Sequence, residues 1–400
     1  MKKVLFVMNT MGRAGAERAL CTLLAAMDEK EFEIDVMVLI PRGEMFLSLP
    51  SYVNIINDSY STQSVYTKKA RISMALQALY ALLYRGYLFR HFQSVRESIR
   101  FQRKQGQIQF DKLAWHAIAH SAKKTAKEYD LAVSYIEGAS VYYTAEFVKA
   151  RRKAAFIHID YQKAGYDKEF DNPYYAKMNQ IFCVSGAVRD RFAEVFPALG
   201  DRLIVFHNLL PVQEIIRLAH AGEGFTDSFD GIRILTVGRL HSQKAYDIAI
   251  QAAAELIGRG RNIRWYVIGE GSERKKLSQL IRQHQMTEHF ILLGSRANPY
   301  PYMKQCDLYV QGTRFEGLSV AAAEALLLKK YIAASDVTGN TEQIIHEQNG
   351  LIFPLSPVPM ADAVERLLTD EELRSRIDRE LAGADAAKQE IPAQFYQLLD

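Results

Sequence analysis

The chain has 400 residues, 48% of them hydrophobic and 24% charged, and its formal net charge is +4. This composition is typical of a soluble globular protein, and the length exceeds that of one ordinary domain, so we expect two domains. No apolar stretch reaches the roughly 18 residues of a membrane-spanning helix, which argues against an integral membrane protein.

The positive charge is concentrated in one segment. Residues 68–127 contain thirteen Lys and Arg residues and only two acidic ones, Glu97 and Asp111, so the segment carries +11 and the rest of the chain −7. A basic segment in an otherwise acidic protein predicts an anionic partner at that place.

The cysteines and the first residues indicate a compartment. Cys21, Cys183 and Cys306 are far apart in apolar contexts, which suits a reducing cytoplasm and provides no metal-ligand spacing. The start, MKKVLFVMNTMG, has the charged beginning of a signal peptide, but its apolar run Val4–Met8 is far too short. We therefore expect a cytoplasmic protein and interpret this run as a buried first strand.

The first half alternates short apolar runs with helical stretches. A strand is predicted at Lys3–Asn9, then a glycine-containing loop and a helix at Glu17–Met27. Further strands are predicted at Ile34–Ile40, Leu131–Tyr135, Ala154–His158, Ile181–Val184 and Leu203–Phe206. Apolar runs separated by helices indicate a parallel, doubly wound sheet.

The basic segment 68–127 interrupts this series and is predicted to be largely helical. Ile72, Leu76, Leu79 and Leu83 recur at helical spacing and share one face, and basic and aromatic residues follow them. This suits a helix lying on an anionic membrane surface. The alternative is an insertion that packs its apolar face on the domain. Nucleic acid is not an expected partner, because no recognised binding motif accompanies the charge.

A second alternating series follows a segment of small and polar residues, Ala219–Asp230. We predict domains at residues 1–215 and 226–375 and a C-terminal helix, 376–400, that packs back on the first domain. Strands are predicted at Ile232–Val237, Ile263–Ile268, Phe290–Leu293, Leu308–Val310 and Tyr331–Ala334, and helices at Tyr246–Ile257, Glu273–His284, Leu318–Leu328 and Thr341–His346.

Ligands of open parallel sheets bind beyond the carboxyl ends of the strands, so the loops there are the candidate sites. In the first domain, Gly12 and Gly15 precede a helix, where backbone N–H groups attract anions; a tight turn is the alternative. The dinucleotide fingerprint G-x-G-x-x-G is missing, which argues against a nicotinamide-dependent oxidoreductase. His158 ends a strand and can reach a ligand, or it is a satisfied strand-end histidine.

In the second domain, Arg239 and Lys244 share one loop and can straddle a diphosphate, unless both are solvated. The loop IGEGSE, residues 268–273, is either a capped turn or the border of a nucleotide base. Glu324 is the only charge in an alanine-rich helix, and it needs a partner if it is not a surface glutamate. Glu316 precedes it by eight residues, about 12 Å on one helix. Glycosidase carboxylates are about 5 to 9.5 Å apart, so we expect the two to bind different parts of one ligand.

These motifs together resemble the retaining glycosyltransferases of family 4. The resemblance rests on VGRLHSQKAYD, IGEGSE, the E-x₇-E stretch with EALLLKK, GNTE and NGLIF, and in the first domain on MGRAGAERAL, CVSGAVRDRF and HNLL. It covers most of the chain except residues 68–127. It implies the α/β GT-B fold, two Rossmann-like domains facing an interdomain cleft, here with a basic helical insertion in the first domain.

The resemblance also implies roles. Arg239 and Lys244 would hold the donor diphosphate, Glu324 the ribose and Glu316 the donor sugar. Gly12 and Gly15 would leave room for donor and acceptor, and His158 would lie near the transferred sugar. The implied catalytic residues are His158, Arg239, Lys244 and Glu316; the implied donor-binding residues are Gly12, Gly15, Gly238, Arg239, Lys244, Glu316, Gly317, Leu318, Ser319 and Glu324.

We therefore expect a retaining, metal-independent hexosyltransferase without a cofactor, at the inner face of the cell membrane. It would move a sugar from a UDP-sugar to a lipid-linked or cell-surface saccharide acceptor. The alternative is a non-catalytic sugar-nucleotide-binding partner subunit. Two positions depart from the family pattern: Ala245 replaces a usual glycine and is less free to take a positive φ, and Tyr331 replaces a usual proline.

Overall fold

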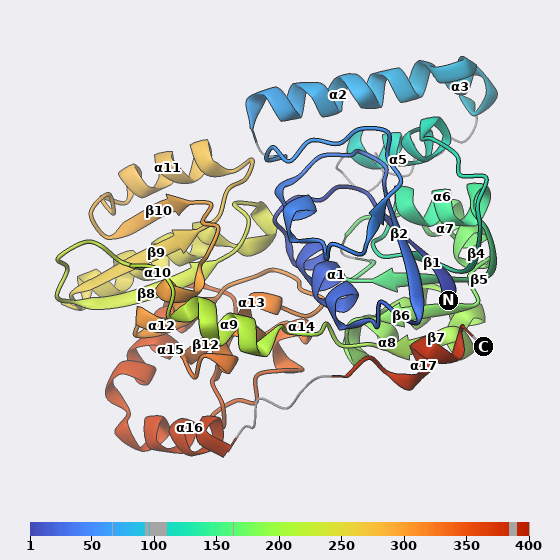
Figure 1. The fold of residues 1–400 in the computed structure, drawn as a ribbon. Coiled ribbons are helices and arrows are strands. Elements are labelled where there is room, and N and C mark those ends of the chain that lie inside the picture. Colours follow the sequence, from blue (N-terminus) through green and yellow to red (C-terminus); the bar gives the residue numbers. More distant parts are fainter. Residues whose placement is uncertain (66, 93–95, 97–109, 163, 384–389, 400) are drawn as a thin grey trace. The chain divides into compact units, whose positions relative to one another are not determined.

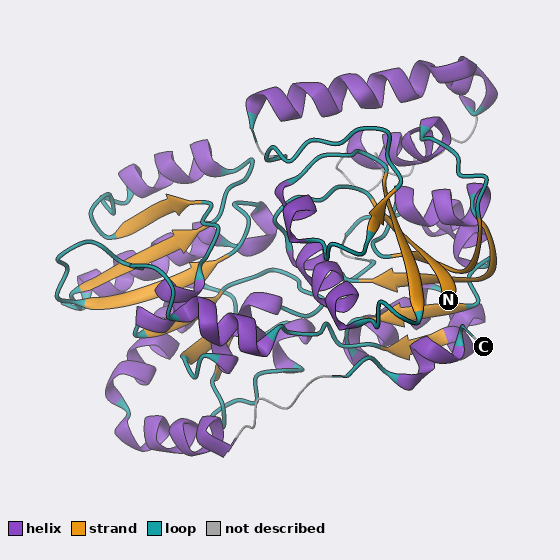
Figure 2. Cartoon of the chain, viewed as in Figure 1, coloured by secondary structure: helices purple, strands orange, loops and turns teal. Residues whose placement is uncertain are grey.

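The computed structural model describes residues 1–65, 67–92, 96, 110–162, 164–383 and 390–399 (Figure 1). The chain divides into two compact units, Met1–Leu209 with Glu390–Asp400, and Leu210–Gln389. Each unit is a parallel sheet covered by helices (Figure 2). The predicted α/β fold with two Rossmann-like domains is therefore confirmed.

The first unit is built on a seven-stranded sheet with strand order β3-β2-β1-β4-β5-β6-β7. Alternate residues of β1 enter two different cores: Val4, Phe6 and Met8 on one face, and Leu5 and Val7 on the other. This is the pattern expected for a sheet covered on both faces. The strands are β1 (Lys2–Met8), β2 (Phe32–Val38), β3 (Asn54–Ile55), β4 (Glu128–Ser134), β5 (Lys149–Ile157), β6 (Gln180–Cys183) and β7 (Leu203–Val205).

The helices of this unit include the described part of the basic insertion. That part forms α2 (Lys68–Leu83), a 3-10 turn (Tyr84–Gly86), α3 (Tyr87–Arg90) and α5 (Phe110–Ser121); residues 93–95 and 97–109 of the predicted insertion lie outside the described residues. The other helices are α1 (Gly15–Ala26), α6 (Ala139–Phe147), α7 (Lys168–Tyr175), α8 (Gly186–Val195) and α17 (Ala393–Gln397), with 3-10 turns at Glu44–Ser48 and Pro197–Arg202.

The second unit is a six-stranded sheet with strand order β10-β9-β8-β11-β12-β13. Its strands are β8 (Ile232–Val237), β9 (Ile263–Ile268), β10 (Phe290–Gly294), β11 (Leu308–Gln311), β12 (Tyr331–Ser335) and β13 (Leu351–Phe353). Its helices are α9 (Val212–Ala219), α10 (Tyr246–Gly258), α11 (Arg274–Gln283), α12 (Tyr300–Gln305), α13 (Val320–Leu327), α14 (Thr338–Thr341), α15 (Pro357–Thr369) and α16 (Glu371–Gly383), with a 3-10 turn at Ser242–Lys244.

The units begin and end at residues other than those predicted. The division falls at Leu209, before the segment that was expected to be the boundary, and the second unit extends to Gln389. The segment 376–400 is not one helix: α16 belongs to the second unit, whereas α17 lies in the first, where Phe395 stacks on Phe6 with ring centroids 6.4 Å apart.

The prediction of a helix at Thr341–His346 is wrong. In this region the structure has only the four-residue helix α14, which ends at Thr341. Beyond it the backbone turns, because the side chain of Asn349 accepts the N–H of Ile345 at 2.8 Å and Glu347 adopts a φ of 61°. The side-chain hydrogen bond replaces a helical one at this point.

Candidate active site

Three loops meet at the carboxyl edge of the second sheet. The loop after β8 runs beside the loop after β9, since Gly238 N–H donates to Ile268 O at 2.9 Å and Leu240 N–H to Glu270 O at 3.0 Å. A Cβ on Gly269 would lie only 1.9 Å from Gly238 O, so this close approach requires glycine at position 269. The predicted loop IGEGSE therefore supports the Arg239–Lys244 loop directly.

The loop after β11 joins the same group through Gln243. The Gln243 side-chain amide donates to Phe315 O at 2.8 Å, and Arg314 N–H donates to Gln243 O at 2.8 Å. The hydroxyl of Thr313, which is fully buried, lies 3.1 Å from Gln243 O and 2.9 Å from Phe315 O. These contacts fix the two charged loops, far apart in sequence, as one surface.

Within this surface, the predicted site residues Lys244 and Glu316 form an ion pair. Their side chains are 14% and 12% exposed, so both charges are largely removed from water. Such a pair is more strongly coupled than a surface salt bridge. Arg239 is exposed, and no described residue forms an ion pair with its guanidinium. The loop thus presents one cation already neutralised and one that remains available to an anion.

A second ion pair, which sequence reasoning missed, braces the same loops. Arg314 donates two hydrogen bonds to the Asp247 carboxylate, at 3.1 and 2.7 Å, and one to Ser242 O. Partial burial raises the pKa of Asp247, but hydrogen bonds from Arg314 outweigh it, and the net pKa is below its usual value. Arg314 in TRFEG and Asp247 in KAYD are both visible in the sequence, but no local pattern indicates that the two residues pair.

Ala245 takes the left-handed backbone conformation, with φ 49° and ψ 35°. The loop therefore keeps the left-handed conformation even though alanine replaces the usual glycine at position 245. The left-handed conformation costs an alanine roughly 1–2 kcal/mol of strain. The turn is held by Tyr246, whose hydroxyl donates to Gly238 O at 2.9 Å. Tyr331, the other departure from the family pattern, donates its hydroxyl to Asp378 of α16 at 2.8 Å.

Glu324 is buried, with 1% of its surface exposed, so the surface-glutamate interpretation is wrong. The Tyr300 hydroxyl of α12 donates to Glu324 Oε1 at 3.0 Å. Ser319 caps the helix that carries Glu324, since its Oγ accepts Ala322 N–H at 3.2 Å. Gly317 is buried and Leu318 half-buried at the entrance to this helix. The Tyr300 hydrogen bond and the Ser319 cap thus orient Glu324, the residue predicted to bind the ribose.

In the first unit, the carboxyl ends of β1, β4 and β5 bring Asn9, Glu137 and His158 together. The Asn9 amide donates to Glu137 O at 2.8 Å and accepts Ser140 N–H at 2.9 Å. The Glu137 carboxylate, which is 2% exposed, accepts the backbone N–H of His158 and that of Ile159, the latter at 3.2 Å. Sequence reasoning missed Glu137; an acid directly after an apolar strand, in SYIEG, was the available signal.

His158 is half-buried and its ring lies 5.1 Å from that of Tyr135. Burial lowers the pKa of His158 to about 4, so its imidazole is neutral at neutral pH. No described residue supplies a hydrogen-bond partner to its buried Nε2. The interpretation as a satisfied strand-end histidine is therefore wrong for this nitrogen.

The glycines of the first loop have different surroundings. Gly12 is buried, and a Cβ there would lie 2.8 Å from Val65 Cγ2, so the loop packs tightly on the chain before α2. Gly15 is exposed and begins α1, whose N-cap residue, Ala14, makes no side-chain capping hydrogen bond. Backbone N–H groups at this helix start are suited to a ligand.

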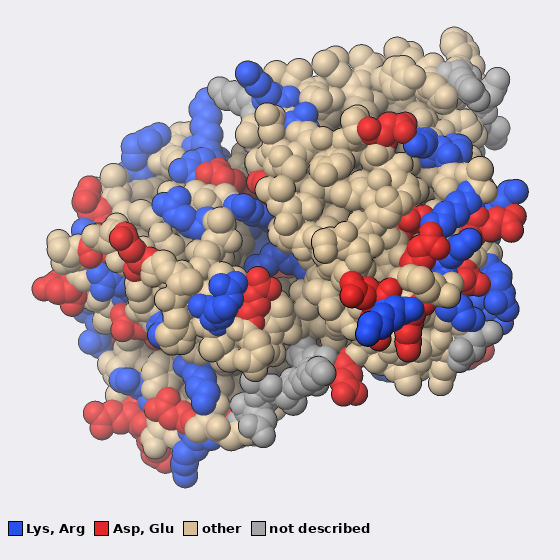
Figure 3. Space-filling model, viewed as in Figure 1, with Lys and Arg blue, Asp and Glu red and all other residues tan. Residues whose placement is uncertain are grey.

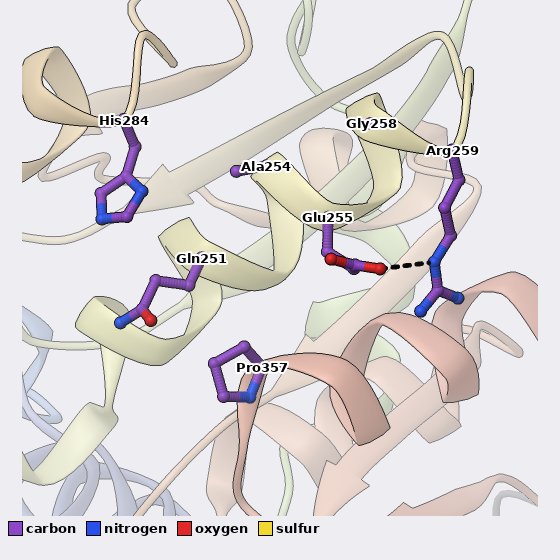
Figure 4. A pocket seen from close by; sticks show the side chains of 7 residues that line it. All are labelled: Gln251, Ala254, Glu255, Gly258, Arg259, His284 and Pro357. Carbon is purple, nitrogen blue, oxygen red and sulfur yellow. Dashed lines mark hydrogen bonds and ion pairs between the residues drawn. The ribbon is translucent and has the colours of Figure 1, made fainter.

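A hollow elsewhere on the second unit contains none of the predicted site residues. It has a volume of about 530 Å³ and lies between α10, the residue after α11 and the start of α15 (Figure 4). The Glu255–Arg259 ion pair, at 3.0 Å, crosses one side of it. Its lining residues are Gln251, Ala254, Glu255, Gly258, Arg259, His284 and Pro357.

The described residues contain no group of three or more His, Cys, Asp and Glu side chains that could hold a metal ion. None of their helices is long and apolar enough to cross a membrane.

A family model matches part of the second unit. Residues 228–381 match the family model "Glycosyl transferases group 1". The second unit thus resembles a glycosyl transferases group 1 domain, in agreement with the family resemblance predicted from the sequence.

Curated relatives match part of their length. An alpha-D-kanosaminyltransferase of Streptomyces kanamyceticus is 32% identical over 208 residues, 47% of this chain and 54% of that protein. An N-acetylgalactosaminyltransferase of Campylobacter jejuni, named for a diphospho-undecaprenol acceptor, is 28% identical over 202 residues, 50% of this chain and 53% of that protein. The chain thus spans about half the length of these relatives.

Solved structures match the fold over the whole chain. Anabaena HepE in complex with UDP-glucose has a TM-score of 0.70 at 16% identity, covering 100% of this chain and 98% of that one. TarM has a TM-score of 0.68 at 12% identity, covering 100% and 99%. These likenesses show a GT-B fold; the cleft expected between the two domains stays a prediction.

Proposed function

We propose that this protein is a glycosyltransferase that moves a sugar from a nucleotide-sugar to a saccharide or lipid-linked acceptor. The observation that carries the proposal is the pairing of Lys244 with Glu316 beside the exposed Arg239, in loops at the carboxyl edge of a group 1 glycosyltransferase domain. Two cations and a carboxylate in one rigid surface suit a sugar diphosphate, which presents phosphate charge next to hydroxyl groups.

The proposed donor is a UDP-sugar. HepE, which shares the fold, was solved with UDP and with UDP-glucose. In this chain Arg239 would bind the diphosphate as a fork and Lys244 as a point charge. The buried Glu324, oriented by Tyr300, would accept hydrogen bonds from ribose hydroxyls.

The ion pair defines how the site would respond to the donor. An incoming diphosphate competes with Glu316 for Lys244, and once Lys244 turns to the phosphates, the Glu316 carboxylate is left to accept hydrogen bonds from the donor sugar. As the bond to the sugar breaks, negative charge grows on the leaving diphosphate. Arg239 and Lys244 stabilise that charge, in the role that other phosphate-transferring sites give to a metal ion. We therefore propose metal-independent transfer.

We further propose transfer with retention of anomeric configuration. Attack from the face that the diphosphate leaves lets a phosphate oxygen accept the proton of the acceptor hydroxyl, so the enzyme needs no nucleophile of its own. His158, neutral at neutral pH, would hydrogen-bond the transferred sugar through the buried Nε2 that has no partner among the described residues.

The proposed acceptor is lipid-linked or part of a cell-surface saccharide. The Campylobacter relative is named for an undecaprenol-linked acceptor, and a Staphylococcus aureus relative, 22% identical over 233 residues, for poly(ribitol-phosphate). For such acceptors, we propose that the reaction takes place at the cytoplasmic face of the cell membrane.

The test is a panel of sugar nucleotides, screened first by thermal shift and then for transfer to short saccharide and polyprenyl-diphosphate saccharide acceptors. We expect UDP and one UDP-sugar to raise the melting temperature, and NMR of the product to show the donor's anomeric configuration. Stabilisation by UDP with neither transfer nor donor hydrolysis would instead support a non-catalytic sugar-nucleotide-binding subunit. Absence of any UDP binding would overturn both interpretations.

A further inference from the structure

Helix α2 turns its large apolar side chains away from the first unit. Ile72, Leu76, Leu79 and Leu83 are 62%, 60%, 53% and 62% exposed. Their spacing of three and four residues puts them in one row along the helix, which we call the α2 stripe. The alternative, in which this face packs on the domain, is therefore wrong.

The opposite face of α2 holds the helix on the unit. Ala70 and Ala81 are buried, with 0% and 1% exposed. Met74 packs against the same core as β1 and α5, and the Gln77 amide donates to Leu39 O at 3.3 Å. A helix that buries small residues and exposes leucines is the reverse of what burial in a soluble protein favours.

The exposed apolar side chains are concentrated here. Phe89 and Phe92, which follow α2, are 93% and 64% exposed, and Tyr80 beside the stripe is 60% exposed. Of the thirteen large hydrophobic residues exposed in the described part of the chain, seven lie between residues 72 and 92. Such a concentration marks an interaction surface, whereas single exposed leucines need no explanation.

The charged residues of the segment that carries the stripe all have one sign. Residues 68–92 contain five basic residues and no acidic residue, and Lys69 is exposed at the start of α2. Figure 3 shows the surface over α2 as largely uncharged, with Lys and Arg at the end where the helix begins. An apolar row in a segment whose formal charges are all positive complements acyl chains beneath anionic headgroups.

We propose that the α2 stripe docks on an anionic membrane surface. The helix lies in the interface with Leu76, Leu79 and Leu83 among the acyl chains and Lys69 at the headgroups. Phe89 and Phe92 reach the same interface. The proposed contact is peripheral, because the helix lies along the surface with only one face in the lipid.

The docked helix is connected to the first candidate loop. Thr67 caps α2 by accepting Ala70 N–H at 3.1 Å, and Val65, two residues earlier, packs on Gly12. If the proposed function holds, the loop that borders the acceptor adjoins the segment that meets the lipid. That arrangement would place a lipid-linked acceptor close to this loop of the first unit.

Flotation of the full chain with vesicles tests the docking without any transfer reaction. We expect binding to phosphatidylcholine vesicles that contain 30% phosphatidylglycerol, little binding to phosphatidylcholine alone, and release by 1 M salt. The double variant Leu76→Gln/Leu79→Gln should partition roughly tenfold more weakly or worse, because two apolar side chains leave the interface. Leu47→Gln, at a site 77% exposed in the same unit, should bind like wild type.

A dye at the stripe gives a readout that does not depend on loss of binding. Cys21, Cys183 and Cys306 are buried, so a polarity-sensitive thiol dye can be directed to Leu79→Cys, with Leu47→Cys as control. Anionic vesicles should shift the emission of the first to the blue and leave the second unchanged.

Equal binding of wild type and the stripe variant, or no blue shift at position 79, would overturn the proposal. So would a blue shift at position 79 without lipid that grows with protein concentration, since it would assign the stripe to a second copy of this chain. None of these outcomes bears on the proposed glycosyl transfer, which is measured with a water-soluble acceptor.

Discussion

The ammonium group of Lys244 is paired with the carboxylate of Glu316, although 72 residues separate them in the chain. The two loops that carry them follow β8 and β11, which are neighbours in the second sheet. Both side chains are largely buried, so each determines the state of the other. Several consequences of this pairing can be measured.

Removing either cation should slow transfer far more than it weakens the fold. For Lys244→Ala and Arg239→Ala we expect kcat to fall by about 10²–10³-fold, the usual loss when one group that stabilises transition-state charge is removed. Steady-state kinetics with the identified donor measures it. Lys275→Ala, at an exposed lysine of α11, is the matched control and should keep wild-type kinetics.

Glu316→Gln should separate binding from catalysis. The Glu316 carboxylate competes with the donor phosphate for Lys244 and also repels that phosphate. Replacing the carboxylate by a neutral amide should therefore tighten UDP binding several-fold while transfer slows. Calorimetric titration with UDP and a transfer assay give the two values. Weaker UDP binding by Glu316→Gln would contradict the proposed competition.

Glu324 can be tested through the ribose. If its buried carboxylate accepts the ribose hydroxyls, wild-type protein should prefer UDP over 2′-deoxy- or 3′-deoxy-UDP by roughly 1–3 kcal/mol, and Glu324→Gln should lose most of that preference. Tyr300→Phe, which removes the hydrogen bond to Glu324, should destabilise the fold by about 1 kcal/mol and weaken the preference less. An unchanged preference in Glu324→Gln would rule out the ribose role.

The contact between the β8 and β9 loops can be tested by substituting Gly269, with Gly258, a glycine outside that contact, as the comparison. Gly269→Ala forces a Cβ to within 1.9 Å of Gly238 O, at a φ of 157°, and should destabilise the protein by about 1–3 kcal/mol and weaken UDP binding. Gly258→Ala, at the end of α10 with no atom within 4 Å of the new Cβ, should be neutral or stabilise by up to about 1 kcal/mol. Chemical denaturation measures both.

Because the pKa of His158 is lowered in the folded protein, we expect the free energy of unfolding to fall in mild acid. Its folded pKa of about 4 lies below the ordinary value of 6.5, so below pH 6.5 the unfolded chain takes up a proton that the folded chain does not. The contribution is therefore fully present above pH 6.5 and decreases toward pH 4, by about 2 kcal/mol at pH 5.

Urea denaturation of wild type and His158→Phe between pH 7.5 and 5 measures this term, because the variant keeps a ring against Tyr135 without the titrating group. The variant should lose less stability over that range. His220→Phe, at an exposed histidine, is the control and should follow the wild-type profile. Parallel profiles for wild type and His158→Phe would contradict the assignment.

The strands and the candidate loops could be predicted from the sequence by itself. β8 (IRILTV) and β9 (IRWYVI) were predicted at their observed residues, because each is a short, largely apolar run bounded by polar residues or glycine, and that signal is local. The same holds for the placement of Arg239, Lys244 and Glu316 in loops after strands. The two-residue β3 and three-residue β13 were missed, since strands that short carry too little periodicity.

Only the tertiary structure decided which of these residues meet. The pairing of Lys244 with Glu316, and the hold of Glu137 on the backbone of His158, depend on strands that are distant in the chain and adjacent in the sheet. The same limit applies to α2. Helical spacing identified Ile72, Leu76, Leu79 and Leu83 as one row, but spacing does not tell whether that row faces the protein or the solvent. The direction of that face was set by where the small residues Ala70 and Ala81 could pack against the unit.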